Sequence, residues 1–303
     1  MRDRWAALIN LPPPKEEHLS ILLQSLGVSV CSGNWEQPSA TPPGGSPALA
    51  LLPLEEYARN CSRQAWFVSG GEPPLTCLLR SATQEAQTLL FQLDHDLFNV
   101  IPDGLYQDGP CLVRTLRGLL SPELMFDILQ FAAEGAQVRR FPVSTLGEKH
   151  EVADEVAALA HSWAVAQRRT RDLHLIVNEL INNAFFHSFR NSDGAEKYSA
   201  RQFEQLEPGE SVAVEVALSD DSIALAVEDN SGTISPREVL RYMVRQTTGE
   251  GLYDSHGRGF FLMSNLTDHL GVCVAPGRRT RIVTVMHAGS VPPVGSLNFF
   301  VAR

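Results

Sequence analysis

The sequence predicts two domains of different fold class: an N-terminal α/β domain with a doubly wound parallel sheet, and a C-terminal α+β two-layer sandwich. Over residues 1–119, short apolar runs alternate with helical patterns, which is typical of parallel strands joined by crossover helices. From residue 138 onward, strands and helices no longer alternate strictly, which favours separate layers of helix and strand. With 303 residues, of which 44% are hydrophobic, the chain can form two cores of ordinary size.

Five apolar runs in the first domain predict buried strands. These runs are residues 5–9, 28–31, 48–52, 65–68 and 97–101. Helical patterns lie between and after them, at residues 18–26, 55–61, 82–93 and 110–119. The segment 37–47 is rich in Pro, Gly and Ser, and we therefore expect a long loop there.

A helix start follows at Ser121, because Ser is a good N-cap and Pro122 fits the first helical turn. An apolar stripe continues through Leu124, Ile128 and Phe131. We therefore expect a connecting helix over residues 120–137, which would equally serve for dimerisation.

The C-terminal domain, residues 138–303, is expected to mix strands and helices. Its strands are predicted at residues 139–144, 212–218, 222–228 and 281–286. Its helices are predicted at residues 151–165, 173–187, 236–244 and 260–270.

One predicted helix, residues 173–187, has two unlike faces. Apolar residues recur at helical spacing along one face, whereas Glu179, Asn183 and His187 follow at i, i+4 and i+8 along another. A carboxylate, an amide and an imidazole are suited to activate a hydroxyl, bind a metal and contact a phosphate. Such a stripe alone is more often a polar surface than a site, so the motifs downstream decide its meaning.

Asp229-Asn230-Ser231-Gly232 follows directly on a predicted strand. A carboxylate at a strand end can accept a hydrogen bond from an exocyclic amine, and the glycine permits close approach of a flat ring. The same four residues are also an ordinary turn sequence. Thr280, at the start of the last strand, is a further candidate for a ring contact.

Gly257-Arg258-Gly259 stands immediately before a predicted helix. Glycines at a helix N-terminus expose backbone N–H groups, and the helix dipole favours an anion there. Further glycines just upstream predict that residues 246–256 form a lid over a bound phosphate.

Four of these motifs resemble, in order and spacing, the N, G1, G2 and G3 boxes of the GHKL (Bergerat-fold) ATPase superfamily. They are Glu179-x3-Asn183, Asp229-x2-Gly232, Gly257-x-Gly259 and Thr280. Within it, GRGFFLMSNLTDHL at residues 257–270 is most similar to the bacterial anti-sigma-factor serine kinases. The resemblance covers about residues 138–290.

The resemblance implies ATP and Mg²⁺ as cofactors and a role for each motif residue. Asn183 would ligate Mg²⁺ through its amide oxygen, and Glu179, one turn earlier, would orient or deprotonate the attacking hydroxyl. Asp229 would bind the adenine amino group. The other implied nucleotide contacts come from His187, Gly232, Gly257, Arg258, Gly259 and Thr280.

The sequence departs from the family pattern in two places. The usual G1 box is DxGxG, whereas Ser231 and Thr233 stand where glycines are expected, which predicts a weaker or altered nucleotide site. The segment 189–208 is longer than in the minimal anti-sigma kinases, either as a loop specific to partners or as an enlarged hairpin connection.

The first domain resembles a response-regulator receiver over residues 1–119, but it lacks the receiver's chemistry. Leu11-Pro12-Pro13-Pro14 replaces the acidic pair after the first strand. Leu52-Pro53-Leu54 replaces the phosphoacceptor aspartate, and Pro102-Asp103 replaces the lysine. Without carboxylates to bind Mg²⁺, we expect a pseudo-receiver that serves for contacts; the alternative is an unrelated small α/β domain.

Composition excludes several classes of function. The net charge of −10 argues against a general nucleic-acid binder, which needs a basic face. Five scattered cysteines without a CxxC pair indicate reduced thiols rather than zinc. The N-terminal apolar run is too short for a signal peptide, and no run of about 18 apolar residues occurs. We therefore expect a cytoplasmic protein without a membrane partner.

These expectations together indicate a bacterial signalling regulator, a serine/threonine kinase of anti-sigma type that phosphorylates a protein partner such as an anti-anti-sigma-like protein. The pseudo-receiver would select that partner, and a homodimer would form through the receiver-like domain or the connecting helix. One alternative is an ATP-responsive partner-binding module with little catalysis. Another is a histidine-kinase-like component without its own phosphoacceptor domain, because His150 lies too close in sequence to Glu179 to belong to a separate domain.

Overall fold

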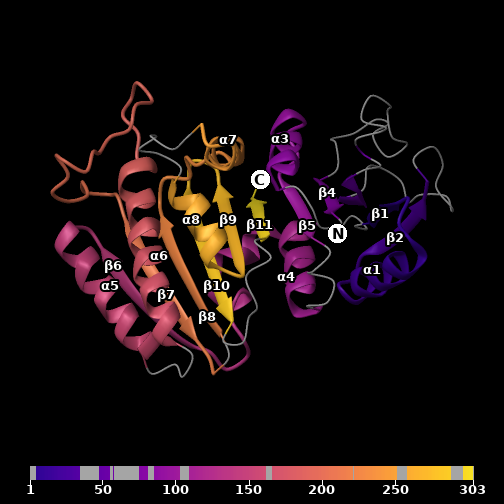
Figure 1. Ribbon diagram of the computed structural model, residues 1–303, viewed down its shortest axis with the longest axis horizontal. Coiled ribbons are helices and arrows are strands. Elements are labelled where there is room, and N and C mark those ends of the chain that lie inside the picture. The colour runs from indigo at the N-terminus through magenta and orange to yellow at the C-terminus, as the bar shows by residue number, and fades with distance from the viewer. Residues whose placement is uncertain are drawn as a thin grey trace. The chain divides into compact units, whose positions relative to one another are not determined.

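The computed structural model describes residues 5–34, 48–54, 57, 75–80, 85–102, 109–161, 166–220, 222–250, 258–287 and 296–302. The chain divides into two compact units, whose elements Figure 1 labels. Unit 1 comprises residues 1–85 and 94–121, and unit 2 comprises residues 86–93 and 122–303.

Unit 1 contains a five-stranded sheet of parallel strands in the order β2-β1-β3-β4-β5. The strands are β1 (Trp5–Ile9), β2 (Ser29–Gly33), β3 (Leu49–Pro53), β4 (Leu75–Arg80) and β5 (Asn99–Pro102). Its helices are α1 (Pro13–Ser25) and α4 (Gly109–Leu120); α3 (Glu85–Asp94) precedes β5 in sequence, but its residues 86–93 are grouped with unit 2. This order is one of the two common doubly wound orders, so the predicted sheet class is confirmed. The receiver-like identity stays a prediction, because unrelated proteins share the order.

The fourth strand of unit 1 differs from the prediction. Leu75–Arg80 pairs in parallel with both β3 and β5, and so takes the place expected for residues 65–68. Three predicted segments lie wholly or mostly outside the described residues: the strand at 65–68, the loop at 37–47 and all but residue 57 of the helix at 55–61. The run Leu75-Thr76-Cys77-Leu78-Leu79 is as typical of a buried strand as residues 65–68 are, and the apolar pattern alone does not distinguish the two.

The continuous connecting helix expected over residues 120–137 is wrong. Two short 3₁₀ helices form instead, η3 (Pro122–Phe126) and η4 (Ile128–Gln130). Asp127 has an extended backbone, and its carboxylate accepts a hydrogen bond from Leu129 N at 3.0 Å, so it ends one turn and caps the next.

The segment after Ser121 packs on the sheet of unit 2. Phe131 lies edge-on to Phe300, with ring centroids 6.3 Å apart, and Cys273 Sγ donates to Met125 O at 3.3 Å. Met125 and Phe131 are both buried. Residues 122–131 therefore form part of this unit's core.

Unit 2 contains a six-stranded sheet in the order β11-β9-β10-β8-β7-β6. Its strands are β6 (Gln137–Val143), β7 (Val212–Leu218), β8 (Ser222–Asp229), β9 (His269–Ala275), β10 (Arg279–His287) and β11 (Ser296–Val301). All neighbours are antiparallel except β11 and β9, which are parallel. The helices are α5 (Leu146–His161), α6 (Ala166–His187), α7 (Pro236–Thr247) and α8 (Arg258–Leu266). Figure 1 shows α5, α6 and α8 over one face of this sheet, as expected for an α+β sandwich.

Two strands of unit 2 were not predicted, β9 and β11. The helix expected over residues 260–270 ends at Leu266, and Thr267 Oγ1 donates to Met263 O at 2.7 Å. Only two residues separate α8 from β9, so the apolar pattern runs on without a break although the conformation changes. Pairing with β10 and β11, rather than local propensity, makes His269–Ala275 a strand.

Candidate functional site

Residues of α5, α6 and the start of α8 line a cavity of about 880 Å³. The predicted residues Glu179, Asn183, His187, Arg258 and Gly259 all line it. The structure therefore brings the N-box stripe and part of the glycine motif together, as the spacing predicts. Gly257 and residues 251–256 of the expected lid lie outside the described residues.

Asn183 is the most telling residue of the cavity wall. Its side chain is buried, at 6% exposure, and within the described part of the chain Nδ2 has no hydrogen-bond partner. A buried polar atom without a partner is destabilising, so each such atom calls for an explanation. The amide therefore fits a bound polar group, and its oxygen is of the kind that Mg²⁺ accepts.

Gly259 lies where α8 approaches α6 closely. A Cβ atom at this position would lie 2.8 Å from Glu179 Oε2 and 3.4 Å from Asn183 Nδ2. A larger residue here would therefore displace the Glu179 carboxylate. The adjoining Arg258 is exposed at the first position of α8, where the N–H groups of the helix face an anion favourably.

Asp229 and Thr280 are brought together by the register of β8 and β10, in which they are direct partners. Both are buried, and within the described residues Thr280 Oγ1 has no hydrogen-bond partner. Burial raises the pKa of Asp229, whereas hydrogen bonds from Ser231 and Ser188 act in the opposite direction. Because Ser188 Oγ donates to Asp229 Oδ2 at 2.8 Å, the end of α6 is tied to this carboxylate.

Gly232 lies in a left-handed conformation, with φ of 65°, against the turn between β9 and β10. A Cβ atom there would lie 2.4 Å from Ala275 O and 2.6 Å from Arg278 N, so only glycine fits. The two hydroxyl side chains that replace glycines of the family pattern, Ser231 and Thr233, both donate hydrogen bonds to nearby groups. Ser231 Oγ donates to Asp229 Oδ1 at 2.5 Å, and Thr233 Oγ1 donates to Ser188 O.

Residues 143–285 match the histidine kinase-like ATPase domain. The matched range contains every residue assigned to the site and supports a GHKL-type ATPase domain in unit 2. Such a domain implies ATP binding. No curated protein matches the chain. Among the described residues, no helix is long and apolar enough to cross a membrane.

Within the ATPase domain, residues 188–211 form an insertion between α6 and β7 that supplies another wall of the cavity. Glu196, Tyr198 and Arg201 of this insertion line the cavity. Phe203 is buried and stacks near Phe185 of α6, with centroids 4.5 Å apart. The insertion therefore packs on the helix that provides the N-box residues.

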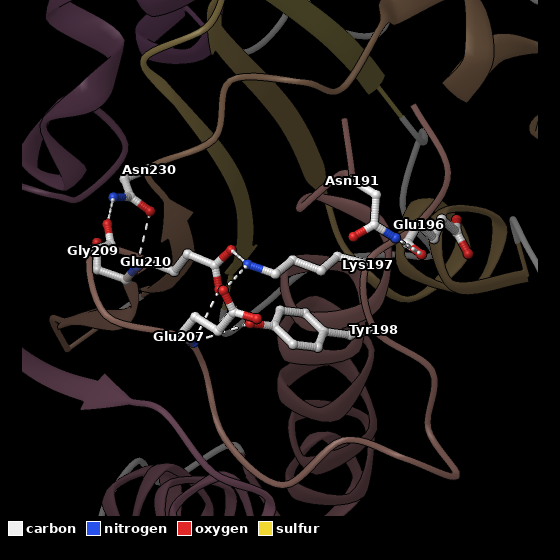
Figure 2. A network of polar contacts seen from close by, with 9 residues as sticks. Asn191, Glu196, Lys197, Tyr198, Glu207, Gly209, Glu210 and Asn230 are labelled. Carbon is white, nitrogen blue, oxygen red and sulfur yellow. Dashed lines mark hydrogen bonds and ion pairs between the residues drawn. The ribbon is translucent and has the colours of Figure 1, made fainter. Parts of the chain in front are cut away.

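A polar network orders the insertion from within (Figure 2). Lys197 Nζ donates to Glu207 Oε2 at 2.7 Å and to Glu210 Oε1 at 2.6 Å, and Tyr198 OH donates to Glu210 Oε2 at 2.5 Å. At its base, Asn230 Nδ2 donates to Gly209 O at 2.7 Å. The turn that contains the G1 residues is thus linked to the insertion.

His187 faces a carboxylate of the insertion in this structure. Its Nδ1 lies 2.8 Å from Glu196 Oε1, and Arg190 lies 3.6 Å from the same oxygen. A phosphate that contacts His187 would have to share it with Glu196 or displace that side chain. The predicted phosphate contact of His187 stays a prediction.

Sequence reasoning missed Lys149, which lies on α5 and lines the cavity. A signal was present, because Thr145-x-x-Glu148 is a capping box. Glu148 N donates to Thr145 Oγ1 at 3.2 Å, while Glu148 Oε2 accepts from Thr145 N at 3.1 Å. This capping box predicts that α5 starts at Leu146 rather than at Glu151, and therefore that Lys149 belongs to the helix. Glu196 and Arg201 gave no such signal.

Proposed function

We propose that the ATPase domain binds Mg·ATP in this cavity and transfers the γ-phosphate to a serine or threonine hydroxyl of a partner protein. The observation that carries this proposal is the buried amide of Asn183, whose Nδ2 has no hydrogen-bond partner among the described residues, beside the Glu179 carboxylate; both side chains lie where a Cβ atom at Gly259 would meet them. In this arrangement, the Asn183 amide would bind Mg²⁺ and the phosphates, and the Glu179 carboxylate would bind the acceptor hydroxyl.

In the proposed reaction, Asn183 Oδ1 would bind Mg²⁺, which neutralises charge on the phosphates. Glu179 is half-buried at the same wall and would take the proton of the acceptor hydroxyl. The hydroxyl oxygen bonds to the γ-phosphorus, the bond from that phosphorus to the β–γ bridging oxygen breaks, and ADP leaves with the electron pair.

The purine would bind at Asp229 and Thr280, which are buried outside the lining of the cavity; Ser188 ties Asp229 to the end of α6. The hydrogen bonds from Ser188 and Ser231 fix the Asp229 carboxylate, whose remaining lone pairs would accept the exocyclic amine. Thr280 Oγ1, buried and without a partner among the described residues, would supply a second polar contact to the ring.

The anti-sigma type of activity rests on the likeness of residues 257–270 to those kinases. On this proposal the substrate is an anti-anti-sigma-like regulator, and unit 1 acts as a pseudo-receiver that selects it, in the cytoplasm. A homodimer through unit 1 belongs to the same proposal, whereas the connecting helix offered as the other dimerisation element does not form.

The test is transfer of labelled phosphate from ATP to candidate partners by the full-length protein. Glu179→Gln should lower the transfer rate by about 100-fold or more, the usual contribution of a general base, while Mg·ATP affinity stays near that of the wild type. Transfer by this variant at the wild-type rate would remove Glu179 from the reaction.

A second candidate is an ATP-responsive module that binds a partner without phosphorylating it. The altered turn at Ser231 and Thr233 favours it, because hydroxyls that bond to Asp229 and to Ser188 O replace flexible glycines beside the purine site. In that case Asn183→Ala would abolish ATP-dependent partner binding, and the wild-type protein would form no phosphoprotein.

A further inference from the structure

Lys149 is a buried cation that the proposed reaction does not yet use. Its side chain is 8% exposed on α5 and lines the cavity together with Glu179 and Asn183. Lysine is rarely buried this far without a partner of opposite charge, because removing an ammonium group from water is unfavourable. The position of Lys149 therefore requires an explanation.

The described partners of Lys149 do not neutralise it. Nζ donates to Asn182 Oδ1 at 2.7 Å, which is a neutral amide, and no described carboxylate lies within ion-pair distance. Glu179 acts on Lys149 through its charge alone. Burial lowers the pKa of Lys149, and Glu179 acts in the opposite direction. An ammonium has three donors, and within the described residues the protein uses one of them.

Lys149 meets α6 at the end of the site that is remote from the purine. Ser188, which bonds to Asp229, marks the purine end of α6, and Asn182 and Glu179 lie six and nine residues before it. At a rise of about 1.5 Å per residue, these positions are about 9 to 14 Å from the purine end. An extended nucleoside triphosphate is long enough to span this distance from its amino group to its last phosphate.

The charge of the cavity also calls for a cation at this place. Glu179 brings negative charge to the lining, and a triphosphate adds more. Arg201 and Arg258 line the same cavity but are exposed, whereas Lys149 is buried in a helix and fixed by Asn182. A cation held in a fixed position stabilises a phosphate more than a mobile surface cation does.

We propose that Lys149 binds the terminal phosphate of the nucleotide and so makes the site prefer ATP to ADP. This inference rests on the proposed function and adds to it a residue that recognises the transferred group. Lys149 would donate its remaining N–H groups to γ-phosphate oxygens, next to the hydroxyl activated by Glu179.

The experiment compares the affinities of full-length wild-type and variant proteins for Mg·ATP and Mg·ADP by calorimetry. Lys149→Gln keeps a hydrogen-bonding group beside Asn182 and removes the charge, and Lys149→Met is a second, apolar variant of similar size. In whichever variant folds, judged by circular dichroism, ATP affinity should fall by about 10- to 100-fold, the value of one hydrogen bond to a charged group. ADP affinity should stay within about twofold.

Lys149→Arg should restore most of the preference for ATP, and Lys15→Met, a change of the same chemistry in unit 1, should leave both affinities unchanged. An equal loss of ATP and ADP affinity, or no loss of either, would overturn the role of Lys149 and leave the proposed function standing. If the wild-type protein binds neither nucleotide, the proposed function fails and this inference fails with it.

Discussion

At the scale of single residues, Gly232 links the nucleotide site to the stability of the domain. Replacing it with alanine forces a left-handed backbone on an ordinary residue and drives Cβ against Ala275 O. Gly277 is a matched control, because its φ is 66° and nothing lies within 4 Å of a Cβ there. Gly277→Ala should cost about 1–2 kcal/mol for the backbone alone.

Gly232→Ala should destabilise the protein clearly more than Gly277→Ala, since the backbone of the β9–β10 turn must also move. Urea unfolding of both variants measures the difference. Equal losses of free energy of unfolding in the two variants would mean that the contact with Ala275 O is of no consequence, and would weaken the explanation for this glycine.

At the scale of elements, the insertion owes its order to packing on α6. Phe203 is buried against Phe185 and Phe186, and the ring centroids of Tyr198 and Phe203 are 5.1 Å apart. Phe203→Ala should remove about 3–5 kcal/mol of local stability, by the usual loss for a buried aromatic side chain. Hydrogen exchange should then become faster across residues 188–211.

Leu175→Ala, a truncation of a side chain 39% exposed on the same helix, should change exchange in the insertion little. Unchanged exchange in the Phe203→Ala protein would show that the polar network around Lys197 and Glu210 suffices to order the insertion.

The elements also show how far sequence reasoning reaches. The strand Val212–Leu218 and the polar stripe of α6 were predicted because both express a local period. The family resemblance implied that Asp229 and Thr280 contact one ring, but the strand register that makes them direct partners was not predicted. β9 and β11 were missed because their conformation depends on pairing with distant strands. Lys149 reaches the cavity from α5, and Glu196 and Arg201 reach it from the insertion; no spacing in the sequence encodes that meeting.

At the scale of the whole molecule, the site lies within unit 2, which also contains the 3₁₀ segment that follows unit 1. The family match over residues 143–285 falls entirely inside this unit. Nucleotide binding should therefore belong to unit 2. A nucleotide that binds only the folded state would raise the free energy of unfolding by about 2.7 kcal/mol at a concentration of 100 times Kd.

Calorimetric titration of the full-length protein with Mg·ATP tests the central claim most directly. The wild-type protein should bind one nucleotide, and Asn183→Ala should lose most of that affinity. Asn178→Ala is the control on the same helix, because Asn178 Nδ2 donates to His174 O at 2.8 Å outside the cavity lining; it should bind like the wild type. No heat and no thermal stabilisation with the wild-type protein, or equal binding by the Asn183→Ala variant, would contradict the assignment of this cavity as an ATP site.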